Sequence, residues 1–180
     1  MKSKAIALFV ALTVLFPWGS DAKTLKFPQK HPEFSVTFPN DWKADITDAG
    51  IITAQPKGAA YAISIFPVVA TTMRGAIEET MKEVDKRFTS IKPGDPVDFS
   101  NDNGIKFLER DMTAKDKDSP RALAIVAFTI DKTTYYALFQ AGTPEADKQY
   151  TQDVIGIVKS IASTSSSNSS NSSKSQGGHN

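Results

Sequence analysis

The sequence contains no cysteine and only two histidines, and both shortages exclude familiar kinds of functional site. Without cysteine the chain can form no disulfide, has no thiolate nucleophile and cannot be anchored to lipid through an N-terminal cysteine, so its stability must come from its core. The two histidines are His31 and His179, too few for the usual zinc sites within one chain. His31 lies between Lys30 and Pro32, where we expect an exposed loop residue rather than the base of a Ser-His-Asp triad.

The chain also lacks an excess of charge of one sign and the sequence motifs of common enzymes. Its 21 basic and 20 acidic side chains give a net charge of +1, which supplies no long-range positive field for nucleic acid or for an anionic membrane. The sequence holds no glycine-rich phosphate loop, no HExxH motif and no GxSxG motif. We therefore expect a protein that is not an enzyme, carries no cofactor and binds no nucleic acid.

The first 22 residues have the pattern of a cleavable secretory signal peptide. Lys2 and Lys4 precede the uncharged apolar run Ala5–Phe16, whose 12 residues are too few to span a bilayer. Ser20 and Ala22 are small residues at positions −3 and −1 of a cleavage site, so we expect cleavage after Ala22. The remaining chain would have 19 basic and 19 acidic side chains. No later apolar stretch approaches 18 residues, so we expect no transmembrane segment. The predicted location is the bacterial periplasm, with the cell exterior or a thylakoid lumen as alternatives.

Composition divides the remainder into one domain and a tail. Residues 23–162 are enough for a single domain with its own core. From residue 163 to residue 180, twelve of eighteen residues are Ser or Asn and none is a large apolar residue. Such a segment cannot bury enough surface to offset the entropy lost on ordering, so we expect a disordered tail.

Hydrophobic periodicity predicts two groups of short strands, each followed by a helix. Alternation is clearest at Phe34-Ser-Val-Thr-Phe38, where three apolar side chains share a face. The alternation is interrupted in the strand expected at 105–113. There Ile105 and Phe107 share one face while Leu108 and Met112 share the other, so we expect a β-bulge near Phe107. Strands are expected at 34–38, 42–47, 51–55, 60–66, 97–100, 105–113, 122–130 and 134–141.

The first helix is expected to begin after Thr71 or Thr72 and to stop at Ile91-Lys-Pro-Gly94. On its solvated face we expect the i, i+4 pairs Glu78 with Lys82 and Glu83 with Arg87. Its apolar stripe consists of Met73, Ile77, Met81, Val84 and Phe88.

The second helix is expected to begin at Pro144, with Thr143 as its N-cap. Its apolar stripe runs from Ala146 to Ile161, and Gly156 beside that stripe is expected to let the helix approach the sheet. The order of strands, helix, strands, helix, with hairpin-length links, predicts an α+β fold. We expect a mostly antiparallel sheet flanked by two helices, an α/β/α sandwich.

Four carboxylates are candidate metal ligands. Glu109 and Asp111 are two residues apart on one strand and therefore share a face, where they could form a proton-transfer pair or the wall of a cation site. The alternative is an ordinary charged pair on the solvated face of an edge strand. Asp116 and Asp118 lie in a loop before Pro120 and could ligate calcium, but the twelve-residue calcium-loop pattern is absent, so we interpret this segment as a solvated loop.

The segment Phe34-Ser-Val-Thr-Phe-Pro-Asn-Asp-Trp42 resembles the opening strand of the PsbP/Mog1-like superfamily, whose members often begin with an aromatic strand followed by Pro-x-x-Trp. The predicted order of elements from Phe34 to Ala162 is similar as well. The resemblance implies a helix-flanked sheet used mainly as a non-enzymatic binding or assembly module. Relatives include lumenal photosystem II subunits, a Ran-binding protein and DcrB-like bacterial envelope proteins.

The resemblance does not extend to every feature of the photosystem subunits. In those subunits metal binding has been associated with histidines and acidic residues, and here only His31 could correspond. Eleven residues, 23–33, precede the first predicted strand, so the extended N-terminal arm of the plant subunits is missing. A bacterial envelope protein is therefore the better match than a photosynthetic one.

The sequence thus favours an exported, non-enzymatic protein of the bacterial envelope that recognises a protein partner through a sheet edge or a loop surface. The alternative is a protein that binds a small ligand or a divalent cation in a cleft between sheet and helix, with Glu109, Asp111, Asp116 and Asp118 as candidate ligands. A hydrolase ranks last, because it would need several polar groups converging in one deep pocket.

Overall fold

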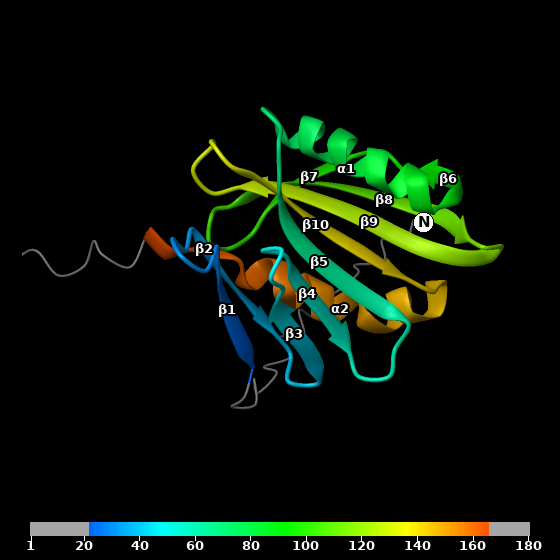
Figure 1. Cartoon of the computed structure of the whole chain (residues 1–180), viewed down its shortest axis with the longest axis horizontal. Helices are drawn as coiled ribbons and strands as arrows, with labels where there is room; N and C mark the ends of the chain where they lie inside the picture. Colours follow the sequence, from blue (N-terminus) through cyan, green and yellow to red (C-terminus); the bar gives the residue numbers. More distant parts are fainter. Residues whose placement is uncertain (1–21, 166–180) are drawn as a thin grey trace, which may run out of the picture.

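The computed structural model describes residues 22–165, which contain eleven strands and two helices (Figure 1). The predicted signal peptide, apart from Ala22, and the predicted tail from residue 166 onward lie outside the described residues. The strands of the first half are β1 (Lys23–Phe27), β2 (Phe34–Phe38), β3 (Trp42–Ile46), β4 (Ile52–Pro56) and β5 (Tyr61–Val68). The helices are α1 (Met73–Arg87) and α2 (Pro144–Ser160). The remaining strands are β6 (Thr89–Pro93), β7 (Val97–Ser100), β8 (Lys106–Asp116), β9 (Ser119–Thr129), β10 (Tyr135–Gly142) and β11 (Ala162–Ser163).

A large antiparallel sheet forms the centre of the molecule. Its strands lie in the order β3-β4-β5-β10-β9-β8-β6, and β7 also pairs with β8. Helices α1 and α2 lie on opposite sides of this sheet, so each covers a separate core (Figure 1). The predicted α+β fold, an antiparallel sheet flanked by two helices, is confirmed.

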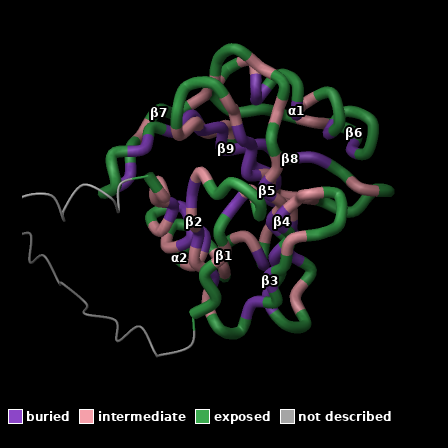
Figure 2. Tube along the Cα trace, turned by 60° about the vertical axis from the view of Figure 1, so that its left-hand side comes forward, coloured by how far each residue is buried: buried purple, intermediate pink, exposed green. Residues whose placement is uncertain are grey.

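The central strands are buried on both faces, which explains why their sequences do not alternate cleanly. Phe107 packs in the core on the α2 side, whereas Leu108 and Met112 pack in the core on the α1 side. The register of β8 against β9 is continuous from Phe107 to Asp116, so the bulge predicted near Phe107 is wrong. Figure 2 shows the buried segments running through the central strands, with the connecting loops exposed. A register irregularity lies instead in β6, between Thr89 and Lys92.

A small second sheet, in the order β1-β2-β11, covers part of the α2-side core. The sequence does not predict strand β1, although Leu25 and Phe27 stand on either side of Lys26 within it. Strand β11 is formed by the first residues after α2, and Ser163, which the sequence placed in the tail, pairs with Phe34. The chain therefore returns after α2 to the strand that carries the aromatic signature.

Helix α1 begins as predicted, with the Thr72 hydroxyl accepting a hydrogen bond from the Gly75 amide. It ends at Arg87, and the segment expected only to stop it forms strand β6, which pairs with β8. The surface ion pairs differ from the predicted spacing, because Lys82 pairs with Glu79 and Lys86 with Glu83 at i, i+3. Exposed pairs of this kind contribute little to stability.

Helix α2 begins with Thr143 and Pro144 as predicted, and the side chain of Asn101 holds its C-terminal end. The Asn101 amide donates hydrogen bonds to the carbonyls of Val158 and Ile161, and its oxygen accepts one from the Ile105 amide. These contacts satisfy carbonyls that a helix end otherwise leaves without partners. The loop before β8 is thereby fixed to α2.

Candidate functional site

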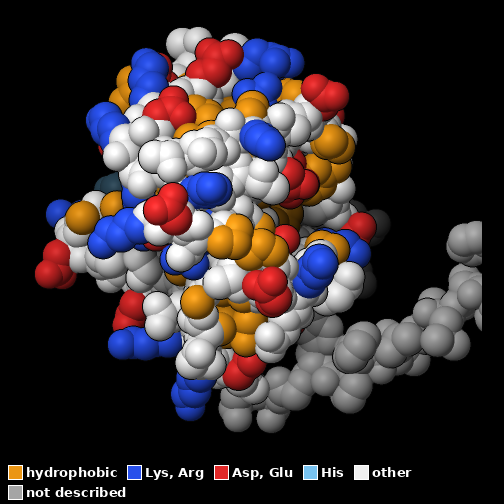
Figure 3. Space-filling model, turned by 90° about the vertical axis from the view of Figure 1, so that its right-hand side faces the viewer, with side chains coloured by type: hydrophobic (Ala, Val, Ile, Leu, Met, Phe, Trp, Pro, Cys, Tyr) orange, Lys and Arg blue, Asp and Glu red, His pale blue; other side chains and the backbone are white. Residues whose placement is uncertain are grey.

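A groove runs over the large sheet beside α1. It consists of two adjoining hollows, of about 370 Å³ and about 310 Å³, that share Ser64, Arg87, Phe88 and Phe139. We call this feature the α1 groove. It exists because α1 packs mainly on β8, β9 and β10 and leaves much of the outer face of β4 and β5 uncovered. Viewed from the right-hand end of Figure 1, hydrophobic side chains gather in patches flanked by charged ones (Figure 3).

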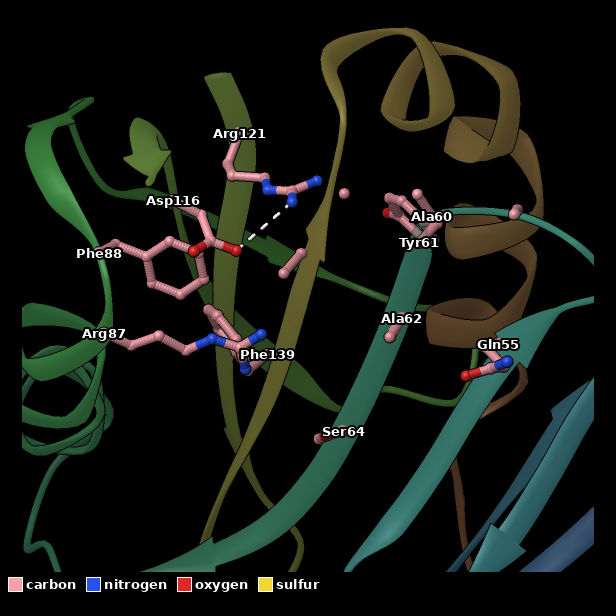
Figure 4. A pocket seen from close by; sticks show the side chains of 13 residues that line it. Gln55, Ala60, Tyr61, Ala62, Ser64, Arg87, Phe88, Asp116, Arg121 and Phe139 are labelled. Atoms are coloured by element: carbon pink, nitrogen blue, oxygen red, sulfur yellow. Dashed lines mark hydrogen bonds and ion pairs between the residues drawn. The ribbon is translucent and has the colours of Figure 1, made fainter. Parts of the chain in front are cut away.

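The α1 groove combines an aromatic floor with two guanidinium groups. Arg121 pairs with Asp116 at 3.4 Å, and both side chains are about one quarter exposed, at 25% each. Figure 4 shows Arg87 extending from the end of α1 toward Phe139, on the same side of the sheet as the Arg121–Asp116 pair. The Arg87 guanidinium lies 5.2 Å from the centre of the Phe88 ring. Within residues 22–165 Arg87 forms no ion pair, so the sequence-based pairing with Glu83 is wrong.

Sequence reasoning missed the α1 groove because its residues come from distant segments. Arg87 was interpreted as part of a solvated helix face, and Asp116 as part of a loop. In the structure β8 and β9 continue to a two-residue turn at Lys117 and Asp118, which both have positive φ. This long hairpin places Asp116 and Arg121 at the groove. No local sequence pattern predicts that these two residues lie near Arg87.

A second polar cluster lies on the opposite face of the sheet, beneath the first turn of α2. Glu109 and Asp111 share this face as predicted, opposite Val126 and Ala124 of β9. Their strand is not an edge strand, because β9 lies on one side of β8 and β6 and β7 on the other, so that alternative is wrong. We call it the α2-side cluster; it comprises Tyr61, Glu109, Asp111, Gln140 and Asp147.

The position of Tyr61 in the α2-side cluster depends on a glycine and on aromatic packing. Gly142 lies opposite Tyr61 in the neighbouring strand, and a Cβ atom at Gly142 would lie 2.2 Å from Tyr61 Cδ2. The Tyr61 ring also packs on Trp42 and Tyr150, with ring centroids 6.0 Å and 5.6 Å away. The indole of Trp42 donates a hydrogen bond to Asp153 of α2. The tryptophan of the aromatic signature thus helps to fix Tyr61 under α2.

Desolvation raises the pKa of each carboxyl group in the α2-side cluster. For Glu109 desolvation is the largest cause, followed by the charges of Asp111 and Asp147. Desolvation is also the largest cause for Asp111 and for Asp147. Groups with raised pKa values bind protons more tightly in the folded chain, so their contribution to stability is present below about pH 4 and is lost as the pH rises through the raised values. At a pH above those raised values the cluster carries unfavourable negative charge.

The structure does not bring the four candidate metal ligands together. Glu109 and Asp111 face α2, whereas Asp116 faces the α1 groove and Asp118 lies in the β8–β9 turn. Within residues 22–165, no group of three or more His, Asp or Glu side chains is arranged to hold a metal ion. His31 is exposed in the loop between β1 and β2, as predicted.

Comparison with known proteins identifies the fold. No protein-family model matches this chain, and no curated protein sequence matches it. The structure is similar to cyanobacterial PsbP (CyanoP) from Synechocystis sp. PCC 6803, with a TM-score of 0.58 and 8% identity over 79% of this chain and 92% of that one. It is also similar to LpqN, involved in cell envelope biogenesis of Mycobacterium tuberculosis, with a TM-score of 0.56 and 12% identity over 80% and 92%.

A third similar structure is a Pseudomonas aeruginosa protein of unknown function described as a putative regulator. Its TM-score is 0.50, with 10% identity over 78% of this chain and 95% of that one. At identities this low the structural similarity shows a shared fold alone, and the PsbP-like fold inferred from the Phe34–Trp42 signature is confirmed. The described residues include no helix with the length and hydropathy needed to cross a membrane.

Proposed function

We propose that this chain is an exported, non-enzymatic binding protein of the bacterial cell envelope that recognises a protein partner through the α1 groove. The observation that carries the proposal is the Arg87 guanidinium, which extends over an aromatic floor and has no ion-pair partner within residues 22–165. The shared fold supports an envelope or lumenal setting, since one similar structure is a PsbP and another is an envelope-biogenesis protein.

The shape of the α1 groove suits an extended segment of a protein. Ala62, Ser64 and Phe66 line it along β5, a run of about 13 Å at the rise of an extended strand. A segment of about four residues would cover that length. Arg121 lines one hollow and Arg87 lies where the two hollows meet, and either would bind a carboxylate, because guanidinium groups match carboxylates in geometry and charge. We therefore expect a partner segment that combines an acidic side chain with apolar ones.

Reversing the charges in the groove should abolish partner recovery. The double variant Arg87→Glu/Arg121→Glu is expected to retain at most one tenth of the partner that the unaltered protein recovers from envelope extracts. A hydrogen bond to a charged group contributes about 1.5–3 kcal/mol, and about 1.4 kcal/mol corresponds to a factor of ten. Affinity purification with quantitative mass spectrometry measures the ratio.

The matched control is Lys82→Glu/Lys86→Glu, which changes the net charge equally on the exposed face of α1. It should recover the partner as the unaltered protein does. Equal recovery by the groove variant would exclude the α1 groove as the site. Consistent recovery of no partner would contradict the proposed function itself.

A further inference from the structure

One edge of the large sheet is open along β7. This strand pairs with β8 and with no other strand in the described part of the chain. The Asn101 amide donates a hydrogen bond to the Ile105 carbonyl, which fixes the phase of the antiparallel ladder between β7 and β8. By the alternation of such a ladder, the backbone groups of Asp98 and Ser100 point away from β8. Strand β7 contains neither the proline nor the lysine that commonly protects an open edge, so it can accept a further strand.

A row of aromatic side chains crosses the sheet and ends at this open edge. Across β10, β9, β8 and β7 the row consists of Tyr136, Phe128, Phe107 and Phe99. Successive ring centroids are 5.4, 5.5 and 5.0 Å apart. The first three rings are fully buried, whereas Phe99, the last ring of the row in the described residues, is only partly buried. Aromatic cross-strand pairs stabilise sheets, so the row favours another aromatic ring beyond Phe99.

A hollow of about 240 Å³ lies beside the end of this row, between the sheet at β7 and the C-terminal half of α2. Most of its wall is apolar and consists of Phe99, Val126, Val154, Ile155 and Val158. Its lining also includes one charge of each sign, Glu109 and Lys159. Ile155 is 41% exposed, and Val97, which lies opposite Glu109 in the ladder, is 57% exposed. Two exposed apolar side chains thus lie beside one apolar hollow at the open edge.

We propose that β7 pairs antiparallel with β7 of a second copy of this chain, about a two-fold axis at Phe99. In this register each Asp98 lies opposite Ser100 of the second copy, and their outward backbone groups form the hydrogen-bonded pairs. A register that placed the two Asp98 side chains opposite each other would oppose like charges. The two Phe99 rings meet at the axis, so the aromatic row of one copy continues into that of the other.

The same register brings the apolar patches of the two copies together. Val97 lies opposite Asn101 of the second copy, which lines that copy's hollow, so the exposed valine packs against the hollow. Glu109 of each copy then lies on the side of Lys159 of the other, and the opposite charges attract. Such a patch is self-complementary, as a closed two-fold dimer requires. The lining of the α1 groove takes no residue from β7, so this contact is independent of the proposed function.

Sedimentation velocity of the full chain, over a concentration series up to the millimolar range, should show an equilibrium between monomer and dimer. Val97→Asp places a charge in the apolar contact and should weaken dimerisation at least tenfold. The matched control is Val69→Asp, which makes the same change at a valine that is 97% exposed between β5 and α1 and should leave dimerisation unchanged. Equal weakening by both variants would overturn the proposal. So would a chain that stays monomeric at every concentration, including one whose edge captures a strand of another protein.

A single introduced thiol tests the register, because the chain contains no cysteine of its own. Phe99→Cys places the two thiols opposite each other at the axis, with about 4.5 Å between their Cα atoms, which is within reach of a disulfide. Asp98→Cys places them two residues out of step, where the Cα atoms are more than about 7 Å apart and cannot be bridged. Mild oxidation should therefore cross-link the Phe99→Cys chain at least tenfold faster than the Asp98→Cys chain. Equal or faster cross-linking of Asp98→Cys would overturn the proposal.

Discussion

Replacing Phe34 with alanine should lower the free energy of unfolding by about 3–5 kcal/mol. Phe34 is fully buried at 0% exposure, and its ring centroid lies within 5.6 Å of the rings of Phe27, Phe128 and Tyr136. These neighbours come from β1, β9 and β10, so the side chain joins the small sheet to the large one. Alanine would leave a cavity among side chains that cannot all collapse into it.

This loss of unfolding free energy is large for a domain of this size, whose stability is expected to be about 5–15 kcal/mol. Denaturant unfolding measures it directly, and the melting temperature should fall by about 10 °C or more. Phe34→Leu is the matched variant, because it retains most of the apolar volume and should cost less than half as much. A change below about 1 kcal/mol for Phe34→Ala would contradict the packing described for the two sheets.

Replacing Gly142 with valine should destabilise the fold by about 3 kcal/mol, at the upper end of the usual cost of overpacking. A Cβ atom at this position would lie 2.2 Å from the Tyr61 ring and 3.2 Å from the Ala60 carbonyl oxygen. The ring cannot move freely, because Trp42 and Tyr150 pack against it. Thermal and denaturant unfolding report the loss, and the Tyr61 side-chain resonances should shift.

A second glycine provides the control for Gly142→Val. Gly156 was expected to let α2 approach the sheet, but a Cβ atom there would have no neighbour within 4 Å, so that expectation is wrong. Gly156→Ala should therefore stabilise the protein by about 0.5–1 kcal/mol through helix propensity alone. If both substitutions proved neutral, Tyr61 would not be held as closely over β10 as the structure shows.

The fold was largely predictable because its signals are local. Alternation at Phe34–Phe38, the Thr72 and Thr143 caps and Pro144 each act within a few residues of chain, and each is found in the structure. The errors occur where tertiary pairing decides. Strand β6 has no strong strand pattern and forms because β8 offers it a partner. The supposed bulge at Phe107 reflects a strand buried on both faces, which sequence periodicity cannot distinguish from irregularity.

The functional surfaces were only partly predictable for the same reason. Glu109 and Asp111 were correctly placed on one face, because the two-residue period of a strand requires it. Their neighbours Tyr61, Gln140 and Asp147 come from three other elements and carry no shared motif. The α1 groove depends on how far α1 extends over the sheet, and nothing in the sequence near Arg87 or Arg121 specifies that.

The central claim, that the α1 groove receives the protein partner, is tested most directly by site-specific photo-crosslinking in the cells that produce the protein. A photoreactive residue at position 55, in place of Gln55 at the groove, should form an adduct with the partner. The same residue at position 26, in place of exposed Lys26 on β1, should form none. An adduct from position 26 without one from position 55 would contradict the account.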